Sequence, residues 1–158
     1  MAMHASKARS VQKPYRDSIK LCQYSWSLEQ FGAMEVPWES MGLRYQQRHI
    51  PEATELDHIY GKGTGCERIF NWMMCCRVAH LWKTDHTTLG RIVAMWCKIK
   101  MQTEQTGLVQ VEHFNPNSIC DIWGRRPIGM LQVWRETEDL PDWADKMSMD
   151  ALERWEAQ

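Results

Sequence analysis

The chain of 158 residues lacks an apolar run anywhere near the ~18 residues that a membrane-spanning helix requires. Its N-terminus is basic, but it lacks the apolar stretch of a secretory signal peptide. Internal repeats and low-complexity segments are also missing. We therefore expect an intracellular, cytoplasmic protein without a membrane partner.

Net charge is almost absent, at −1, but the charges are unevenly distributed. Basic side chains predominate in residues 1–20, and acidic side chains predominate from Glu136 to the end. A basic segment attracts phosphates, and an acidic segment repels them unless it lies on another face. Solvated surface at both ends explains the same pattern, so charge alone does not assign a partner.

The chain has six cysteines, and the absence of a signal peptide favours a reducing compartment in which disulfides are rare. Cys75 and Cys76 are adjacent and lie among Met and Trp residues. This context suits buried thiols or metal ligands. We expect thiols in the core.

Hydrophobic residues make up 44% of the chain and charged residues 25%, which is ordinary for one globular domain with its own core. Residues 1–13 are small, polar and basic without periodicity, so we expect a disordered basic N-terminus. A helix is expected to begin at Pro14, which suits a first turn, and a short one after Ser27 as its cap.

The middle of the chain predicts two strands and a helix. Weak alternation indicates a strand over Thr54–Tyr60, and the turn GKGTG separates it from a short returning strand over Ile69–Trp72. A helix is expected over Met74–Lys83, with Ala79, His80 and Lys83 on one face.

Three more helices are expected towards the C-terminus. Residues 87–101 carry an apolar stripe at helical spacing, formed by Ile92, Val93, Trp96 and Ile99. The segments Gln132–Glu136 and Met149–Ala157 also have helical patterns, and Ser148 is a candidate cap for the second.

The most informative residues lie between Asp57 and Lys83. Asp57-His58-Ile59, then Asn71, then His80 with Lys83 three residues later resembles the HNH endonuclease motif, D-H-I…N…H-x-x-K. The resemblance implies an α+β, mostly helical fold, in which a short hairpin and a helix form a ββα-metal core flanked by additional helices. It implies a nuclease-like domain over residues 14–104. Residues 105–158 would be an extension, turn-rich and then helical, packed on the same domain.

The residue types suit phosphodiester hydrolysis. A divalent ion stabilises the negative charge of the phosphate and the leaving oxygen. Mg²⁺ prefers oxygen ligands such as those of Asp57 and Asn71. A neutral imidazole is a suitable general base for water, a role that fits His58. Asp57 and His58 point to opposite faces of a regular strand, so they converge only where the strand ends or bends.

The resemblance also implies roles for the helix residues. His80 would be a metal ligand or a residue that supports catalysis, together with Asn71, and Lys83 would contact a phosphate oxygen. Mg²⁺ is the expected cofactor, and Mn²⁺, Ni²⁺ or Zn²⁺ are open alternatives. Each residue alone also has a structural explanation: His58 as a strand histidine, Asn71 as a turn residue and His80 as a core-edge histidine.

Many HNH domains hold a structural zinc ion with two C-x-x-C pairs. The matching positions here are Cys22 with Ser25 and Cys76 with Ala79, so each pair has lost one thiol. Alanine cannot bind zinc, and a serine hydroxyl is a poor ligand. We therefore expect degenerate zinc positions at Cys22 and Cys76, and a fold closed by packing without structural zinc.

The function that the resemblance implies is a divalent-metal-dependent endonuclease that hydrolyses DNA. Double-stranded DNA would be its partner, and a second copy of the chain or another phage or mobile-element protein are further candidates. One alternative is a catalytically weak or inactive HNH-fold protein that binds nucleic acid or takes part in assembly. Another is a cysteine hydrolase that uses Cys76 and His80, although no oxyanion hole is evident in the sequence.

Overall fold

The computed structural model describes residues 5–31, 50–60, 71–104 and 127–157, and these form an α+β structure dominated by helices. In chain order the elements are α1 (Ala5–Ser18), α2 (Gln23–Phe31), β1 (Glu55–His58), β2 (Trp72–Cys75), α3 (Arg77–Asp85), α4 (Thr87–Glu104), α6 (Pro127–Thr137) and α7 (Asp142–Glu156). The expected mostly helical α+β class is confirmed. Among the described residues, no helix has the length and apolar character needed to cross a bilayer.

The two strands form one antiparallel hairpin, in which Asp57 lies opposite Met73 and His58 lies opposite Trp72. The first strand was expected, and β1 falls within the predicted range. The expected position of the second was wrong, because β2 begins at Trp72, and Ile69 and Phe70 lie outside the described residues. All four residues of β2 are buried. A short strand buried on both faces has no alternation, so periodicity cannot distinguish it from a helix.

The same ambiguity explains the start of α3. We expected this helix to begin at Met74, but Met74 and Cys75 belong to β2 and α3 runs from Arg77 to Asp85. Its inner face packs on β1 and on α4, with Ala79 fully buried. The short path from β2 into α3 brings the helix residues back over the end of β1.

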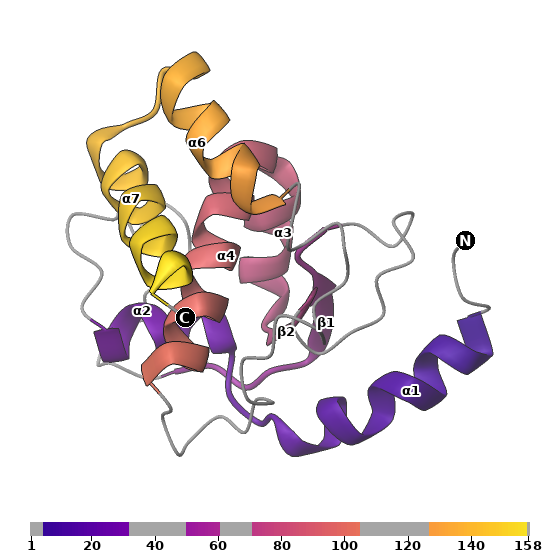
Figure 1. The fold of residues 1–158 in the computed structure, drawn as a ribbon. Helices are drawn as coiled ribbons and strands as arrows, with labels where there is room; N and C mark the ends of the chain where they lie inside the picture. The colour runs from indigo at the N-terminus through magenta and orange to yellow at the C-terminus, as the bar shows by residue number, and fades with distance from the viewer. Residues whose placement is uncertain (1–4, 32–49, 61–70, 105–126, 158) are drawn as a thin grey trace.

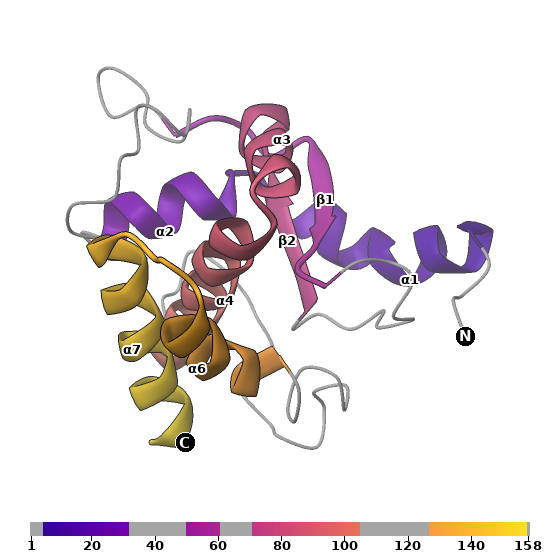
Figure 2. The same cartoon turned by 90° about the horizontal axis from the view of Figure 1, so that it is seen from above.

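Helix α4 lies at the centre of the molecule, with the hairpin and α3 on one side and α6 and α7 on the other (Figure 2). Its expected apolar stripe is buried as predicted. Burial extends around almost the whole helix, since α2, α3 and α7 all pack against it. At Gly90 an added Cβ atom would lie 2.5 Å from the main-chain oxygen of Lys83. Only glycine therefore allows α4 to approach the end of α3 so closely.

The C-terminal helices α6 and α7 pack against each other, and α7 packs against α4. The indole nitrogen of Trp96 on α4 donates a hydrogen bond of 2.8 Å to Asp150 on α7. Both helices are longer than expected, and the capping role of Ser148 was wrong. Ser148 lies inside α7 and donates to the main-chain oxygen of Ala144 at 2.8 Å. A serine can satisfy its hydroxyl in this way within a helix, so it does not mark a helix start by itself.

The N-terminal part differs from the expectation. Residues 5–13, expected to be irregular, form the first turns of α1, and Pro14 lies inside this helix. Helix α2 begins at Gln23, so Ser27 is an interior residue and not a cap. Figure 1 shows α1 extending away from the other helices, with its C-terminal end against them.

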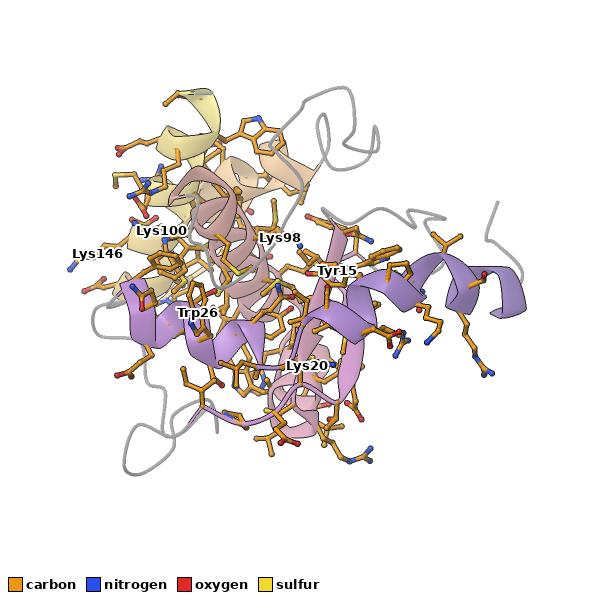
Figure 3. The ribbon with its side chains drawn as sticks, turned by 90° about the horizontal axis from the view of Figure 1, so that it is seen from below. Tyr15, Lys20, Trp26, Lys98, Lys100 and Lys146 are labelled. Carbon is orange, nitrogen blue, oxygen red and sulfur yellow. The ribbon has the colours of Figure 1, made fainter. Side chains whose placement is uncertain are left out.

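Tertiary contacts at that end of α1 account for the difference. The Tyr15 hydroxyl donates to Gln23 at 2.6 Å, and the fully buried Lys98 ammonium donates to the Tyr15 hydroxyl at 3.0 Å. Lys98 also donates to the main-chain oxygen of Trp72 at 2.7 Å. Figure 3 shows Tyr15 and Lys98 pointing toward one another. This buried network joins α1, α2, β2 and α4, and no local sequence signal reports it.

Candidate active site

A cavity of about 320 Å³ opens where the end of β1 meets α3 and the start of α4. Four residues of the predicted motif line it: Asp57 and His58 from β1, and His80 and Lys83 from α3. Side chains outside the motif complete the lining: Leu56, Thr84, Thr87 and Arg91. Residues far apart in the sequence thus converge on one pocket.

Asp57 is the central acid of this pocket and is only 3% exposed. Its Oδ2 accepts a hydrogen bond of 2.6 Å from the Tyr24 hydroxyl. Its Oδ1 lies 3.2 Å from the Lys83 ammonium and 3.5 Å from Nε2 of His80. Burial raises the pKa of Tyr24, and the negative charge of Asp57 raises it further. The phenol therefore stays protonated and holds one carboxylate oxygen, while the other faces His80.

His80 is oriented by Glu55 on β1. Its Nδ1 lies 2.9 Å from Oε2 of Glu55, whose other oxygen pairs with Arg77 at 3.3 Å. A proton on Nδ1 would be donated to Glu55 and would leave the Nε2 lone pair facing Oδ1 of Asp57. This pairing of an imidazole with a carboxylate is the arrangement that orients metal-binding histidines. Both ring nitrogens face carboxylates, and this geometry gives no support to a catalytic pair of His80 with Cys76.

His58 is the last residue of β1 and is buried. The chain leaves the strand after it, and for this reason Asp57 and His58 line the same pocket despite being adjacent. The strand was expected to run to Tyr60, and it ends two residues earlier, at His58, which meets the condition for Asp57 and His58 to converge. His58 thus lies beside the candidate metal ligand.

Lys83 does not point outward to a phosphate. Its ammonium donates to three oxygens at the end of β1: Oδ1 of Asp57 at 3.2 Å, and the main-chain oxygens of His58 at 2.6 Å and Ile59 at 2.9 Å. Burial lowers the pKa of Lys83, and Asp57 opposes that shift. Lys83 therefore holds the strand end and balances the charge of Asp57.

Asn71 lies immediately before β2 and is fully buried. Its amide oxygen accepts from the main-chain nitrogen of Tyr60, and its amide nitrogen donates to the main-chain oxygen of Tyr60, both at 3.0 Å. The main-chain oxygen of Asn71 accepts from Ile59 at 2.8 Å. Asn71 is not among the residues that line the cavity. We assign it to holding the chain after β1 instead of to binding metal.

Three of the candidate zinc positions, Cys22, Ser25 and Cys76, lie near the N-terminal end of α3. The Ser25 hydroxyl lies 3.5 Å from the sulfur of Cys22, and Ala79 is buried. A hydrogen bond with Cys76 raises the pKa of the Cys22 thiol, and burial raises it further. Cys22 and Cys76 are thus neighbours. Cys22, Ser25 and Cys76 lie together, and the degenerate zinc site stays a prediction.

The side chains fit a divalent ion with few protein ligands. Within the described part of the chain, no group of three or more His, Cys, Asp or Glu side chains is arranged to hold a metal ion. Oδ1 of Asp57 and Nε2 of His80, 3.5 Å apart, can share an ion whose ligand distances are about 2.1 Å. Mg²⁺ commonly keeps several waters and takes only one or two protein carboxylates beside substrate phosphates. Asp57 alone fits that mode of binding, and an ion shared with the imidazole of His80 is better suited to Ni²⁺ or Zn²⁺.

Sequence reasoning missed Glu55, Tyr24 and Arg91. Glu55 had a signal, because it lies two residues before Asp57 and strand residues at that spacing share a face. Tyr24 and Arg91 had none, since only the packing of α2 and α4 on the hairpin and α3 brings them to the site.

No protein-family model matches the chain, and no curated protein or solved structure matches it either. The HNH resemblance therefore rests on the motif residues and stays a prediction.

Proposed function

We propose that the chain is a divalent-metal-dependent endonuclease of the HNH type, which hydrolyses phosphodiester bonds in double-stranded DNA. One observation carries the proposal: Asp57, His58 and His80 line a single pocket, with Nε2 of His80 only 3.5 Å from Oδ1 of Asp57. A pair of candidate metal ligands beside a candidate base is what hydrolysis of a phosphodiester requires.

Asp57 and His80 would hold the ion, which when bound supplies Lewis-acid stabilisation of charge on the phosphate and the leaving oxygen. His58 accepts the proton of the attacking water. Glu55 orients His80 through Nδ1, and Tyr24 fixes Asp57 through Oδ2. Lys83 holds the strand end, so that His58 and Asp57 stay on the same pocket.

A second candidate function is nucleic-acid binding without catalysis. The observation that favours it is the Lys83 ammonium 3.2 Å from Oδ1 of Asp57, because a lysine can neutralise this carboxylate without any metal. Metal dependence separates the two functions.

The test is incubation of the full chain with supercoiled plasmid and Mg²⁺, Mn²⁺, Ni²⁺ or Zn²⁺, each beside EDTA. We expect cleavage with at least one ion and none in EDTA. Asp57→Asn should weaken metal binding, so that cleavage needs a higher metal concentration, while DNA affinity measured in EDTA changes little. DNA affinity should instead fall with added salt, as expected for contacts to phosphates.

Asp145→Asn is a matched control, since Asp145 pairs with Arg135 between α6 and α7 and lies outside the pocket lining. Circular dichroism shows whether both variants fold. Metal-independent DNA binding without cleavage by the wild-type chain would replace the nuclease proposal with the binding-protein alternative.

A further inference from the structure

We propose that Arg91, a residue outside the motif, binds the phosphate group of the substrate, the role that the motif implies for Lys83. This inference rests on the proposed function and names the residue that recognises a phosphodiester in the same pocket. It follows from the contacts of Lys83, the position of Arg91 and the charges around them.

The hydrogen bonds of Lys83 leave its ammonium no donor for a substrate. An ammonium has three N–H donors, and Lys83 has three oxygen acceptors between 2.6 and 3.2 Å. Its side chain is only 11% exposed. A phosphate contact by Lys83 would require breaking hydrogen bonds that hold the end of β1.

Arg91 lies one turn after Thr87 on α4, so the two side chains share a helix face, and both line the cavity. Its guanidinium carbon lies 4.7 Å from the centre of the Tyr60 ring. A guanidinium on an aromatic ring keeps its N–H donors available at its edge, in a fork that matches two phosphate oxygens. Among the residues that the structure describes, no carboxylate pairs with Arg91.

The aromatic support of Arg91 is itself held in place. Tyr60 is 8% exposed, its hydroxyl contacts the sulfur of Met95 at 3.7 Å, and its main-chain nitrogen and oxygen both bond to the Asn71 amide. Asn71 therefore acts on the pocket indirectly, by holding the ring that supports Arg91. Pre-organised donors of this kind stabilise developing charge at the least cost in reorganisation.

The charges of the site also favour Arg91. Glu55 and Asp57 bring two negative charges, and Arg77 and Lys83 pair with them. Arg91 remains as the positive charge of the pocket that is not neutralised by these carboxylates. A phosphodiester carries one negative charge and gains another as water adds, so this surplus complements the substrate and its transition state.

The experiment measures single-turnover cleavage of a short labelled DNA duplex by the full chain with its most active metal. Arg91→Gln should lower the cleavage rate by about 10²–10³-fold, as for loss of one pre-organised donor. Arg91→Lys should restore little, because an ammonium does not reproduce the fork. Arg135→Gln, which removes an arginine on α6 that pairs with Asp145, is the matched control and should cleave like the wild type.

A positioning role for Tyr60 is tested beside it. Tyr60→Phe keeps the ring and should cleave at close to the wild-type rate, whereas Tyr60→Leu should be slower. If the ring acts through Arg91, the double variant Tyr60→Leu with Arg91→Gln should be no slower than Arg91→Gln alone. Thermal unfolding followed by circular dichroism checks that each variant folds.

Calorimetric titration with inorganic phosphate in EDTA supplies a readout independent of cleavage, and Arg91→Gln should weaken phosphate binding. An active wild type with an equally active Arg91→Gln variant overturns the role of Arg91 and leaves the nuclease proposal intact. If the wild type fails to cleave DNA with every metal ion tested, the nuclease proposal is defeated. The phosphate titration then decides: weaker binding by Arg91→Gln supports the anion site, and equal binding or none in both proteins overturns it.

Discussion

Single side chains at this site act through the main chain as much as through the pocket. Asn71 and Lys83 both belong to the motif, and the side chains of both form hydrogen bonds with main-chain atoms of the residues that follow Asp57. They fix where β1 ends. The position of the end decides whether His58 and Asp57 face one pocket or opposite sides of the hairpin.

The role of His58 is open to a direct test. His58→Ala should lower DNA cleavage by about 10²–10⁴-fold, the usual effect of losing a general base. Folding should change little, because the main-chain oxygen that accepts from Lys83 is kept. Cleavage assays with saturating metal, together with thermal unfolding, check both expectations. A variant that cleaves at the wild-type rate would show that His58 is not the base.

Asn71 should matter first for stability. Asn71→Ala leaves the buried main-chain nitrogen and oxygen of Tyr60 without their partners, at a cost of about 1–3 kcal/mol for each group that finds no other. Urea unfolding should therefore show a clearly lower free energy of unfolding. Asn71→Asp keeps the accepting oxygen and should fail to donate, so it cannot restore full stability. If Asn71→Ala were as stable as the wild type, the hydrogen bonds between Asn71 and the main chain of Tyr60 would not hold the chain after β1 as inferred.

At the scale of elements, α3 serves two regions at once. Its pocket-facing side carries His80 and Lys83, and its N-terminal end brings Cys76 to Cys22, beside Ser25 at the start of α2. Helical spacing predicted that side chains three and four residues apart would share a face. Spacing along the sequence did not predict that the N-terminal end of α3 would lie beside the start of α2, because tertiary packing decides this contact.

This meeting makes the degenerate zinc site testable. The double change Ser25→Cys with Ala79→Cys should create a four-thiolate site with Cys22 and Cys76. Elemental analysis should then show about one zinc per chain and the melting temperature should rise, since metal binding adds to folding free energy. A chelator should reverse the gain. Stoichiometric zinc held by thiolates in the wild-type chain would disprove the idea that the site is degenerate.

At the scale of the whole molecule, the core holds several acids in their neutral form. Burial is the main cause that raises the pKa of the Cys75 and Cys97 thiols. The pKa of the Cys22 thiol is raised by its hydrogen bond with Cys76 and by burial. The phenol of Tyr15 is also raised by burial. These groups are buried in the core between the helices and the hairpin, so their protonation affects the stability of the whole fold.

Stability should therefore fall in alkaline solution. Above the ordinary thiol pKa of 9.0 the unfolded chain loses thiol protons that the folded chain retains, so the free energy of unfolding decreases as pH rises. Each buried thiol contributes up to about 1.4 kcal/mol per pH unit. Lys83, with its lowered pKa, acts in the opposite direction, but it is one group against three thiols.

Urea unfolding between about pH 7 and pH 10.5 measures this slope. Cys97→Ala removes one titrating group and should make the decline less steep, whatever its effect on stability at neutral pH. A stability that stays level or rises above pH 9 would show that the thiols ionise in the folded chain.

The sequence by itself determined the local features: the mostly helical class, a strand that contains Asp57 and His58, the helix over residues 87–101 and the motif residues that line the pocket. These depend on spacing along one segment, where periodicity and adjacency suffice. It failed at β2, whose burial on both faces removes alternation, and at α1 and Ser148, where tertiary contacts or main-chain bonding override local signals.

Only the tertiary structure decided how the polar atoms are used. The bonds of Tyr24 to Asp57 and of Lys83 to the strand end join segments separated by more than twenty residues. The position of Arg91 depends on the packing of α4 against α3 at Gly90, where no other residue fits. Such contacts are set by the packing of whole helices, and the residues that make them leave no mark in the spacing of the sequence.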